Sequence, residues 1–442
     1  MLRGIYTFLF INKCKPCTCK GGVNIKKILI ILCVVLCLTG CNSLTSRSNI
    51  TSLLSAPKLN VNESNIVAAI ENYLGEDINL KYSKNQGYSA PIQLIDLNND
   101  GISEAAVFYY APNKGTNIRF AILSYNEDKW NIVMDKEGLG AEVFYFDTMV
   151  LPYVEGKQIA VGYLSSNIDE NFFVTYFTDA NLALEDYVES CQDIVTGDIT
   201  GNGYPDIILT KHPSGKNISL NLLSFTEGLK FETLGSKKLK YNNIDITQIK
   251  INQTISGQMA VYVDYADIHS HMYTEIYALE NGRFTSCVEA GVVSKNWEYE
   301  PVIVSTDING DGYLETPTVM QPHYIEEVPT FKYLEWSDWT QSEVVRVYFG
   351  IYDVRENIFV ALPDEWQNNI YAEAFENGFE MKDVETQQTR LTVTEIESAA
   401  QVESGAYSYV VYLGTKMWHI NFSQDMSMSQ VEYVYRSIKD FN

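Results

Sequence analysis

This 442-residue chain has little positive charge and few histidines. It carries 32 Lys and Arg against 56 Asp and Glu, for a formal net charge of −24 at pH 7, and only five histidines. So acidic a surface repels nucleic acid and anionic lipid headgroups, which argues against nucleic acid as a partner. The sequence also lacks a Gly-x-Ser-x-Gly motif, a phosphate-binding loop and a dinucleotide fingerprint, so it carries no signature of those enzyme classes.

Long apolar runs are scarce, and the strongest lies near the N-terminus. Ile28–Leu38 is almost wholly apolar and follows two lysines. A charged region, a short apolar run and small residues before a cut are typical of a secretory signal, here residues 1–40. The sequence Leu-Thr-Gly-Cys41 resembles the bacterial lipobox, and this resemblance implies that Cys41 is the lipidated first residue of the mature protein. An ordinary signal with an incidental cysteine and an uncleaved anchor are the alternatives.

The first 22 residues contain Cys14, Cys17 and Cys19, whose spacing could bind metal, but an over-long assigned start explains them more simply. Loss of residues 1–40 removes six Lys or Arg and no acid, which changes the net charge from −24 to about −30. The lipid, not surface charge, would then hold the protein at the membrane. Residues 41–58 contain the lipidated cysteine and a Ser/Thr/Asn-rich flexible tether.

Cysteine is almost absent from the rest of the chain. Only Cys191 and Cys287 remain after Cys41. Two thiols do not make a disulfide scaffold, although a single bridge between them is an open alternative in an extracytoplasmic protein.

Three short acidic stretches share one spacing of oxygen-bearing residues, with glycine at position 6. Alternate ligands around a glycine turn are typical of a Ca²⁺ loop. The expected ligands, at positions 1, 3, 5, 7 (a backbone carbonyl) and 9, are Asp96, Asn98, Asp100, Ile102 and Glu104 in the first loop, Asp198, Thr200, Asn202, Tyr204 and Asp206 in the second, and Asp307, Asn309, Asp311, Tyr313 and Glu315 in the third.

Ordinary acidic hairpin turns are the alternative interpretation of these loops. Three copies in the same phase favour Ca²⁺ as the bound ion, most strongly in loops one and three. Loop two has only two carboxylates, and Thr200 is a poor ligand, so this loop is predicted to be a weak or vacant site.

The last ligand of each loop also marks an internal repeat. Similar segments begin at Glu104, Gln158, Asp206, Gln258 and Glu315, at spacings of 54, 48, 52 and 57 residues. Each leads into strand-like runs separated by turn residues, for example Ile118–Tyr125 and Trp130–Met134 in the first unit. About fifty residues with roughly four antiparallel strands fit one blade of a β-propeller.

The loop spacing at the head of each unit resembles the FG-GAP/VCBS repeats of integrin α-chain propellers and of many bacterial surface proteins, over roughly residues 90–350. The resemblance implies a mainly β fold with a propeller at 91–361, of which five blades are recognisable. Family propellers more often have seven, and strands within 77–95 or 340–361 could complete the ring. Units two and four, which carry Gln158 and Gln258, would be blades without calcium. A β-sandwich or an open β array is the competing fold.

Two segments flank the repeats. Residues 59–90 form a lead-in with an amphipathic helix at Asn62–Leu74. Residues 362–442 are expected to form a small α+β domain, with strands near 371–376, 390–395, 407–413 and 417–422 and a final helix from Ser429 to Phe441.

Two further clusters could bind ligands. His269 and His271, with Asp267, would share a face of a strand and could hold a transition metal, but a polar loop tip is the more common explanation. Trp336 and Trp339 lie in an aromatic-rich segment and could stack on a sugar or anchor a protein, but filling the core of a blade is favoured.

Together these features predict a non-enzymatic lipoprotein on the outer side of a bacterial cell membrane. It would be anchored by lipid on Cys41, would carry structural Ca²⁺ and would bind an extracellular polysaccharide or protein. An envelope hydrolase with an unresolved carboxylate pair, acting on a polysaccharide or cell-wall substrate, is the alternative. A scaffold or assembly factor of an envelope complex is a further alternative.

Overall fold

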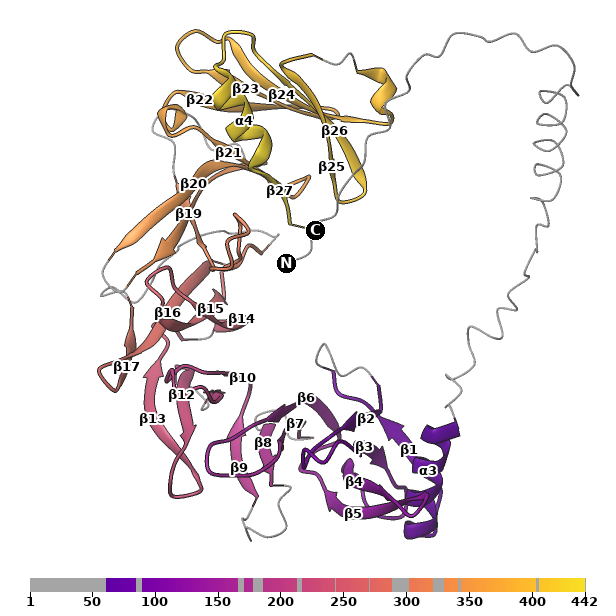
Figure 1. Ribbon diagram of the computed structural model, residues 1–442. Helices are drawn as coiled ribbons and strands as arrows, with labels where there is room; N and C mark the ends of the chain where they lie inside the picture. Colours follow the sequence, from indigo (N-terminus) through magenta and orange to yellow (C-terminus); the bar gives the residue numbers. More distant parts are fainter. Residues whose placement is uncertain are drawn as a thin grey trace, which may run out of the picture. The chain divides into compact units, whose positions relative to one another are not determined.

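The computed structural model is mainly β, and its described residues form six antiparallel sheets (Figure 1). The structure describes residues 61–84, 90–165, 171–177, 186–212, 217–242, 244–269, 271–287, 302–320, 330–340, 343–402 and 405–441. The predicted signal peptide, Cys41 and the tether lie outside these residues. No helix in the described ranges is long and apolar enough to span a bilayer.

The first four sheets follow the chain in order. Sheet 1 contains β1 (Asn79–Lys81), β2 (Ile92–Ile95), β3 (Glu104–Tyr110), β4 (Arg119–Asn126) and β5 (Lys129–Glu137). Sheet 2 contains β6 (Glu142–Met149), β7 (Gln158–Leu164), β8 (Asn171–Tyr176) and β9 (Tyr187–Cys191). Sheet 3 contains β10 (Ile194–Gly197), β11 (Asp206–Lys211), β12 (Ser219–Phe225) and β13 (Phe231–Lys238). Sheet 4 contains β14 (Ile244–Gln253), β15 (Met259–Asp267), β16 (Met272–Glu280) and β17 (Arg283–Ser286).

The last two sheets are less regular. Sheet 5 contains β18 (Thr316–Met320), β19 (Phe331–Trp339), β20 (Val344–Asp353), β21 (Ile358–Leu362) and the C-terminal β27 (Ile438–Asp440). Sheet 6 contains β22 (Ile370–Phe375), β23 (Gly378–Asp383), β24 (Thr389–Ile396), β25 (Ser408–Leu413) and β26 (Lys416–Phe422). Short 3₁₀ helices occur at Asp364–Trp366 and Ala399–Gln401.

The predicted repeat coincides with the sheets. Strands β3, β7, β11, β15 and β18 begin at, or one residue after, the five positions that define the repeat. The first three of these strands are buried along almost their whole length, because each has neighbours on both sides and apolar side chains on both faces. The fourth strand of a sheet is more polar, as in β13, where exposed and partly buried residues alternate.

Apolar clusters join each sheet to the next. Sheets 1 and 2 share a cluster that includes Phe120 and Phe146, and sheets 2 and 3 share one that includes Phe173 and Leu209. Further shared clusters join sheet 3 to sheet 4, sheet 4 to sheet 5 and sheet 5 to sheet 6. Each sheet therefore buries apolar residues against its neighbours in the chain, as in stacked β-repeats.

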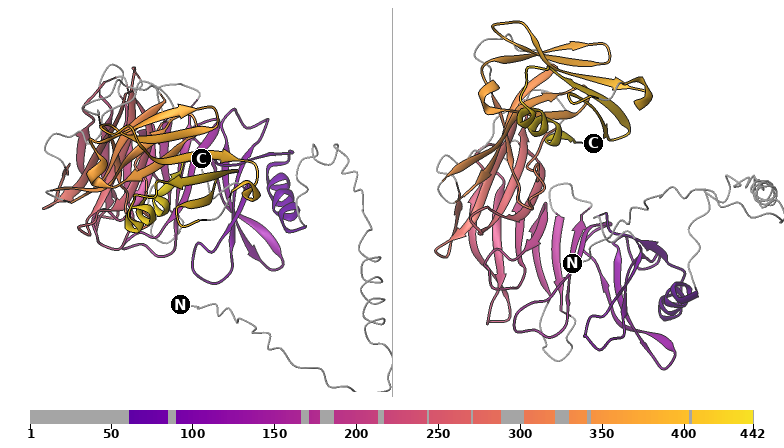
Figure 2. Two further views of the ribbon diagram at one scale, coloured as in Figure 1. Left: turned by 90° about the horizontal axis from the view of Figure 1, so that it is seen from above. Right: turned by 45° about the horizontal axis from the view of Figure 1, so that its top comes forward.

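The N-terminal helix agrees with its prediction, whereas the C-terminal one is shorter than predicted. Helix α3 (Val61–Leu74) packs against sheet 1 through Ile66 and Ile70. Helix α4 (Met428–Arg436), the yellow helix near the C-terminus in Figure 2, begins at a capping box formed by Ser427 and Gln430 and contacts β21. The predicted helix to Phe441 is wrong, because the chain leaves the helix at Ser437 and then pairs as β27 with β21.

This strand also affects the predicted C-terminal segment. Sheet 6 and α4 give residues 362–442 the expected mixture of strand and helix. However, β27 belongs to sheet 5, and one apolar cluster contains residues of sheets 5 and 6 and of α4.

Cys191 and Cys287 are both free, so the alternative of a disulfide between them is wrong.

A buried carboxylate of sheet 4 positions the entry to the third acidic loop. Asp264, on β15, accepts hydrogen bonds from Ser305 N at 3.0 Å, Ser305 Oγ at 2.9 Å, Thr274 Oγ1 at 2.5 Å and Gln248 Nε2 at 3.1 Å. Ser305 lies two residues before Asp307. Sheet 4 therefore fixes the backbone from which the loop starts.

We predict that Asp264→Ala lowers the free energy of unfolding by about 2–5 kcal/mol, because it leaves several buried donors without an acceptor. Asp245→Ala, at an exposed position of β14, is the matched control and should change it by less than about 0.5 kcal/mol. Denaturant melts of the three proteins measure this difference. Equal stabilities of the two variants would contradict the role given to Asp264.

Candidate metal centres

All three acidic loops are hairpin connections to an inner strand. Loop one joins β2 to β3, loop two joins β10 to β11, and loop three leads into β18. The residue before each loop pairs with the residue at position 9, as in Ile95 with Glu104 and Gly197 with Asp206. In loop three the same pair is the isolated bridge between Thr306 and Glu315. The three loops are thus equivalent in the fold as well as in sequence.

The aspartate at position 1 closes each loop onto its own backbone. In loop one, Asp96 accepts from Asp100 N at 3.2 Å and Gly101 N at 3.0 Å. The equivalent distances are 3.0 and 2.8 Å to Asp198 in loop two, and 3.1 and 2.9 Å to Asp307 in loop three. Shared bonds of this kind fix the curvature of the loop before any ligand is present.

Left-handed backbone makes this curvature accessible. The glycines at position 6, which are Gly101, Gly203 and Gly312, have φ values of 86, 86 and 95°. Position 4 is left-handed as well, and is Asn99 in loop one and glycine in the other two. A branched side chain at either position would strain the turn, so the predicted role of the glycine is confirmed.

The remaining predicted ligands line the same turns. At position 3, Asn98 Oδ1 and Asn309 Oδ1 accept from the N–H of position 5 at 3.0 and 2.8 Å. At position 7, the N–H groups of Ile102, Tyr204 and Tyr313 donate to the side chain at position 5, at 2.7, 2.8 and 2.9 Å. These bonds hold the position-7 residues, whose carbonyls are the expected ligands, at the turn.

The carboxylate at position 9 is the buried part of each loop. One oxygen accepts from the N–H of position 2, at 2.9 Å for Glu104, 2.9 Å for Asp206 and 2.8 Å for Glu315. Asp206 is 1% exposed and Glu315 is fully buried. Their other oxygens, Asp206 Oδ1 and Glu315 Oε1, have no hydrogen-bond partner among the described residues. An ionised oxygen buried in this way is costly unless a cation balances it.

Loop three contains the closest group of acidic side chains among the three loops. Oxygens of Asp307, Asp311 and Glu315 lie within 4.8 Å of one another, and no other three acids, histidines or cysteines of the described residues meet so closely. Since Ca²⁺ binds oxygens at about 2.3–2.6 Å, two of its ligands are at most about 5 Å apart. The three carboxylates of loop three are therefore already spaced for one ion.

A fourth carboxylate, which lies outside the loop motif and is not apparent from the sequence, faces loop three. Thr316 pairs with Ser337, so the next residue of β19, Asp338, lies beside Glu315. Burial, with smaller effects of Asp311 and Asp307, raises the pKa of Asp338 to about 6. The equivalent positions opposite Glu104 and Asp206 are Ser124 and Ser224, so only loop three has this additional charge.

Loop two has the geometry of the others with less charge. It contains two carboxylates, and Thr200 Oγ1 is buried without a hydrogen-bond partner in the described part of the chain. Asn202 at position 5 replaces the aspartate of the other loops. A weaker site than loop three remains the prediction for loop two.

Units two and four use an amide where the others use a carboxylate. Gln158 is fully buried, and its Nε2 donates to Glu155 O at 3.0 Å. Gln258 Nε2 donates to Leu279 O at 3.2 Å. A neutral amide with a hydrogen-bond partner has no charge for a cation to balance, and the absence of calcium from these units stays a prediction.

The structure corrects the speculative ligand-binding role of two tryptophans. Trp336 is fully buried and Trp339 is 5% exposed, so neither ring has a face for a sugar or a protein partner. Trp336 stacks on Phe441 in a core cluster, and Trp339 Nε1 donates to Thr316 Oγ1 at 2.6 Å. Both residues fill the core of sheet 5, as the favoured explanation expected.

The histidine cluster is a loop tip between β15 and β16. Asp267 accepts from the backbone N–H groups of His269 and His271 at 2.8 and 2.9 Å, and its other oxygen lies 3.0 Å from His271 Nδ1. These hydrogen bonds lower the pKa of Asp267, although burial opposes them. The carboxylate therefore organises the turn, and this agrees with the loop-tip interpretation.

A serine and a histidine meet on sheet 6. Ser408 Oγ lies 2.8 Å from His419 Nε2, and burial lowers the pKa of this histidine. His419 alternates along β26 with the buried Trp418 and Ile420, so it lies on the opposite face of the strand. No acid among the described residues hydrogen-bonds His419, so the third member that orients a hydrolytic triad is missing there.

Comparison with known protein families found no family model that matches the chain. Comparison with curated proteins found no match either. The geometry of the loops is therefore the basis for any assignment of function.

The charge state of loop three leads to a prediction about pH. Burial, helped by Asp338 and Asp311, raises the pKa of Glu315 to about 7 from an ordinary value of 4.5. Without a cation, the stability that this group contributes is present below its ordinary pKa and is lost as pH rises through about 7. Calcium needs the ionised form, so protons compete with it below that pH.

We therefore expect calcium to raise the melting temperature more at about pH 8 than at about pH 5.5. Glu315→Gln should remove most of this pH dependence, because the amide does not ionise. Differential scanning calorimetry with and without calcium at both pH values measures the effect. A calcium shift of equal size at both would contradict the ionisation proposed for Glu315.

Proposed function

We propose that this protein is a non-enzymatic, calcium-stabilised binding protein of a bacterial cell surface. The observation that carries the proposal is the acidic hairpin that occurs three times with the same internal hydrogen bonds. In each copy a buried carboxylate lies at, or one residue before, the start of an inner strand, and in two copies one of its oxygens has no partner among the described residues. A divalent cation supplies the missing positive charge.

The role proposed for Ca²⁺ is structural. The ion neutralises the acidic side chains at the head of a sheet and locks the hairpin from which the inner strand starts. Extracellular modules bind calcium with Kd values of about 10⁻⁴–10⁻³ M, which is sufficient where free calcium is plentiful. Such affinity suits a protein that faces outside the cytoplasm.

The finer fold that we propose is a β-propeller of FG-GAP/VCBS-like blades. Sheets 2 to 4 have the meander order of a four-stranded blade, and sheets 1 and 5 extend that order with one more strand each. The apolar clusters between consecutive sheets supply the packing that a propeller requires. Closure of the ring is part of this proposal.

The proposed location follows from the sequence. Lipid on Cys41 would anchor the body to the membrane, and the acidic composition, with a net charge of −24, disfavours nucleic acid as a partner. The ligand proposed is an extracellular polysaccharide or protein. Co-purification with a fixed membrane partner would favour the scaffold alternative, and turnover of a cell-wall substrate would favour the hydrolase.

Removing calcium should destabilise the protein. At free calcium of ten to a hundred times Kd, one site adds about 1.4–2.7 kcal/mol to the free energy of unfolding, so chelator should lower the melting temperature by a few degrees. Asp307→Ala should shrink this shift most, because loop three gathers the most carboxylates, and Asp96→Ala should shrink it less. Asp245→Ala is the control. A melting curve unaffected by chelator would count against the metal assignment.

Replacing the predicted lipidation site should release the protein from the membrane. We expect Cys41→Ser to move the protein from the membrane fraction to the soluble or unprocessed fraction, since the acidic body has no affinity of its own for anionic lipid. Cys191→Ser, at a buried and free thiol, is the control and should leave the protein in the membrane fraction. Fractionation of cells with immunoblotting measures this, and membrane retention of Cys41→Ser would overturn the anchor.

A further inference from the structure

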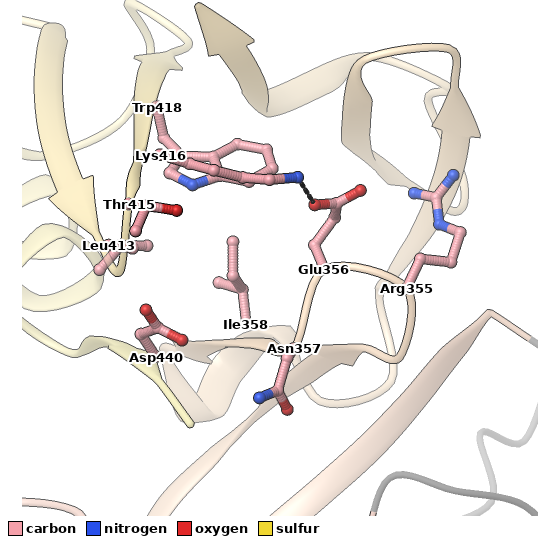
Figure 3. Close-up of a pocket in the computed structure, with 9 residues that line it drawn as sticks. All are labelled: Arg355, Glu356, Asn357, Ile358, Leu413, Thr415, Lys416, Trp418 and Asp440. Atoms are coloured by element: carbon pink, nitrogen blue, oxygen red, sulfur yellow. Dashed lines mark hydrogen bonds and ion pairs between the residues drawn. The ribbon is translucent and has the colours of Figure 1, made fainter. Parts of the chain in front are cut away.

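A cavity of about 200 Å³ lies where hairpin turns of sheets 5 and 6 meet (Figure 3). The turn between β20 and β21 contributes Glu356 and Asn357 to its wall. The turn between β25 and β26 contributes Thr415, whose side chain is exposed. The strand β27, a segment whose sequence predicts a helix, contributes Asp440.

The inner wall contains a hydrogen-bond donor without an acceptor. Trp418 is 1% exposed, and its indole Nε1 has no hydrogen-bond partner in the described structure. Figure 3 shows this nitrogen on the edge of the ring that faces the cavity. Buried N–H groups without an acceptor are rare, because the hydrogen bond to water that is lost on burial is not replaced by one within the protein. An occupant of the cavity that offers an oxygen would satisfy Trp418.

The two basic side chains around the cavity, Lys416 and Arg355, are already paired. Lys416 Nζ lies 2.6 Å from Glu356 Oε2 and 3.0 Å from Glu395 Oε2. Arg355 binds the buried Asp353 with two of its nitrogens, at 3.1 and 2.7 Å. Neither cation is left to bind an anion, so the cavity disfavours an anionic occupant.

The cavity also has an apolar side. Ile358 points into it, and Leu413 lies on the opposite strand pair (Figure 3). A volume of about 200 Å³ is below the roughly 300–1,000 Å³ of pockets for drug-sized ligands, so it suits a single small ring. Hydroxyl groups that both donate and accept, on a ring with a C–H face, are the chemistry of a sugar.

Access to Trp418 requires a small movement. The Lys416 ammonium lies 5.6 Å from the centre of the indole ring, and its ion pairs with Glu356 and Glu395 are both partly exposed. Exposed ion pairs contribute little to stability, so the lysine can be displaced at low cost.

We infer that this cavity binds one neutral sugar ring, as the terminal or branch residue of a glycan. One hydroxyl accepts from Trp418 Nε1–H, and others donate to the carboxylates of Asp440 or Glu356, while the C–H face packs on Ile358 and Leu413. The inference rests on the proposed function and narrows its ligand to carbohydrate. The cavity takes the place of the buried Trp336 and Trp339 as the sugar site.

The test observes the indole signals directly. The full chain, labelled with ¹⁵N-tryptophan and held in a detergent without a sugar headgroup, has six indole N–H signals. Trp418→Phe assigns one of them by its loss. Glucose, galactose, mannose and N-acetylglucosamine are then titrated singly, and at least one should shift the Trp418 signal with Kd on the order of 1–10 mM.

Two matched variants separate the cavity from the surface. Thr415→Trp should fill the mouth of the cavity and weaken binding at least about tenfold. Tyr412→Trp places the same side chain at a highly exposed position of β25 and should leave binding unchanged. If Trp418→Phe does not fold, the signal that moves with sugar in the wild type but not in Thr415→Trp supplies the assignment.

Three results would overturn the inference. These are no shift with any of the sugars, equal shifts in Thr415→Trp, and shifts with alanine or glycine but not with sugars. If the indole proton of Trp418 contacts only a long-lived water, no sugar shifts its signal, and the inference is overturned by the first of these results. A calcium-dependent melting shift that persists in the same sample would leave the proposed function standing, so the two failures are distinguishable.

Discussion

A buried carboxylate at, or one residue before, the start of an inner strand is the interaction on which the rest of the structure depends. In loops one to three this group is Glu104, Asp206 or Glu315, and one of its oxygens is held by the N–H of position 2. The other oxygen of Asp206 and of Glu315 has no partner in the described part of the chain. A negative charge placed there must be balanced, and the acids of the same loop make a cation the fitting counter-charge.

Units two and four have a different group at this position. Gln158 and Gln258 occupy the corresponding position, and each donates to a nearby backbone carbonyl. An inner strand therefore starts beside one of two groups. The first is a glutamine amide that donates to a backbone carbonyl, and the second is a buried carboxylate. The amide is hydrogen-bonded within the protein, whereas one oxygen of Asp206 and of Glu315 has no partner among the described residues.

Local features of the sequence predicted much of the fold. The repeat was visible because each inner strand is a short apolar run that follows a turn, and the loops were visible because their ligands are close in sequence. The strands β6 and β14, which precede the turns of units two and four, are less visible in the sequence, since half-exposed strands carry a weaker apolar signal. The final helix was overextended because Ile438 and Phe441 fit a helical period, yet pairing with β21 decides the conformation of Ile438.

Features made by long-range pairing could not be predicted. Asp338 joins the third loop only because β19 pairs with β18, and a β-bulge at Trp336 and Ser337 breaks the alternation that would have located it. The cavity beside Trp418 combines residues from three separate hairpins or strands. The burial of Trp336 and Trp339 agrees with the core-filling role that the sequence favoured, and it excludes the speculative binding role.

The most direct test of the central claim is anomalous diffraction from crystals of the protein equilibrated with calcium or terbium. We expect a peak bonded to Asp307, Asp311 and Glu315, at oxygen distances of about 2.3–2.6 Å, with a weaker or absent peak in loop two. Ordered density for the third loop with no ion between these carboxylates, at saturating metal and at a pH where Glu315 is ionised, would contradict the account.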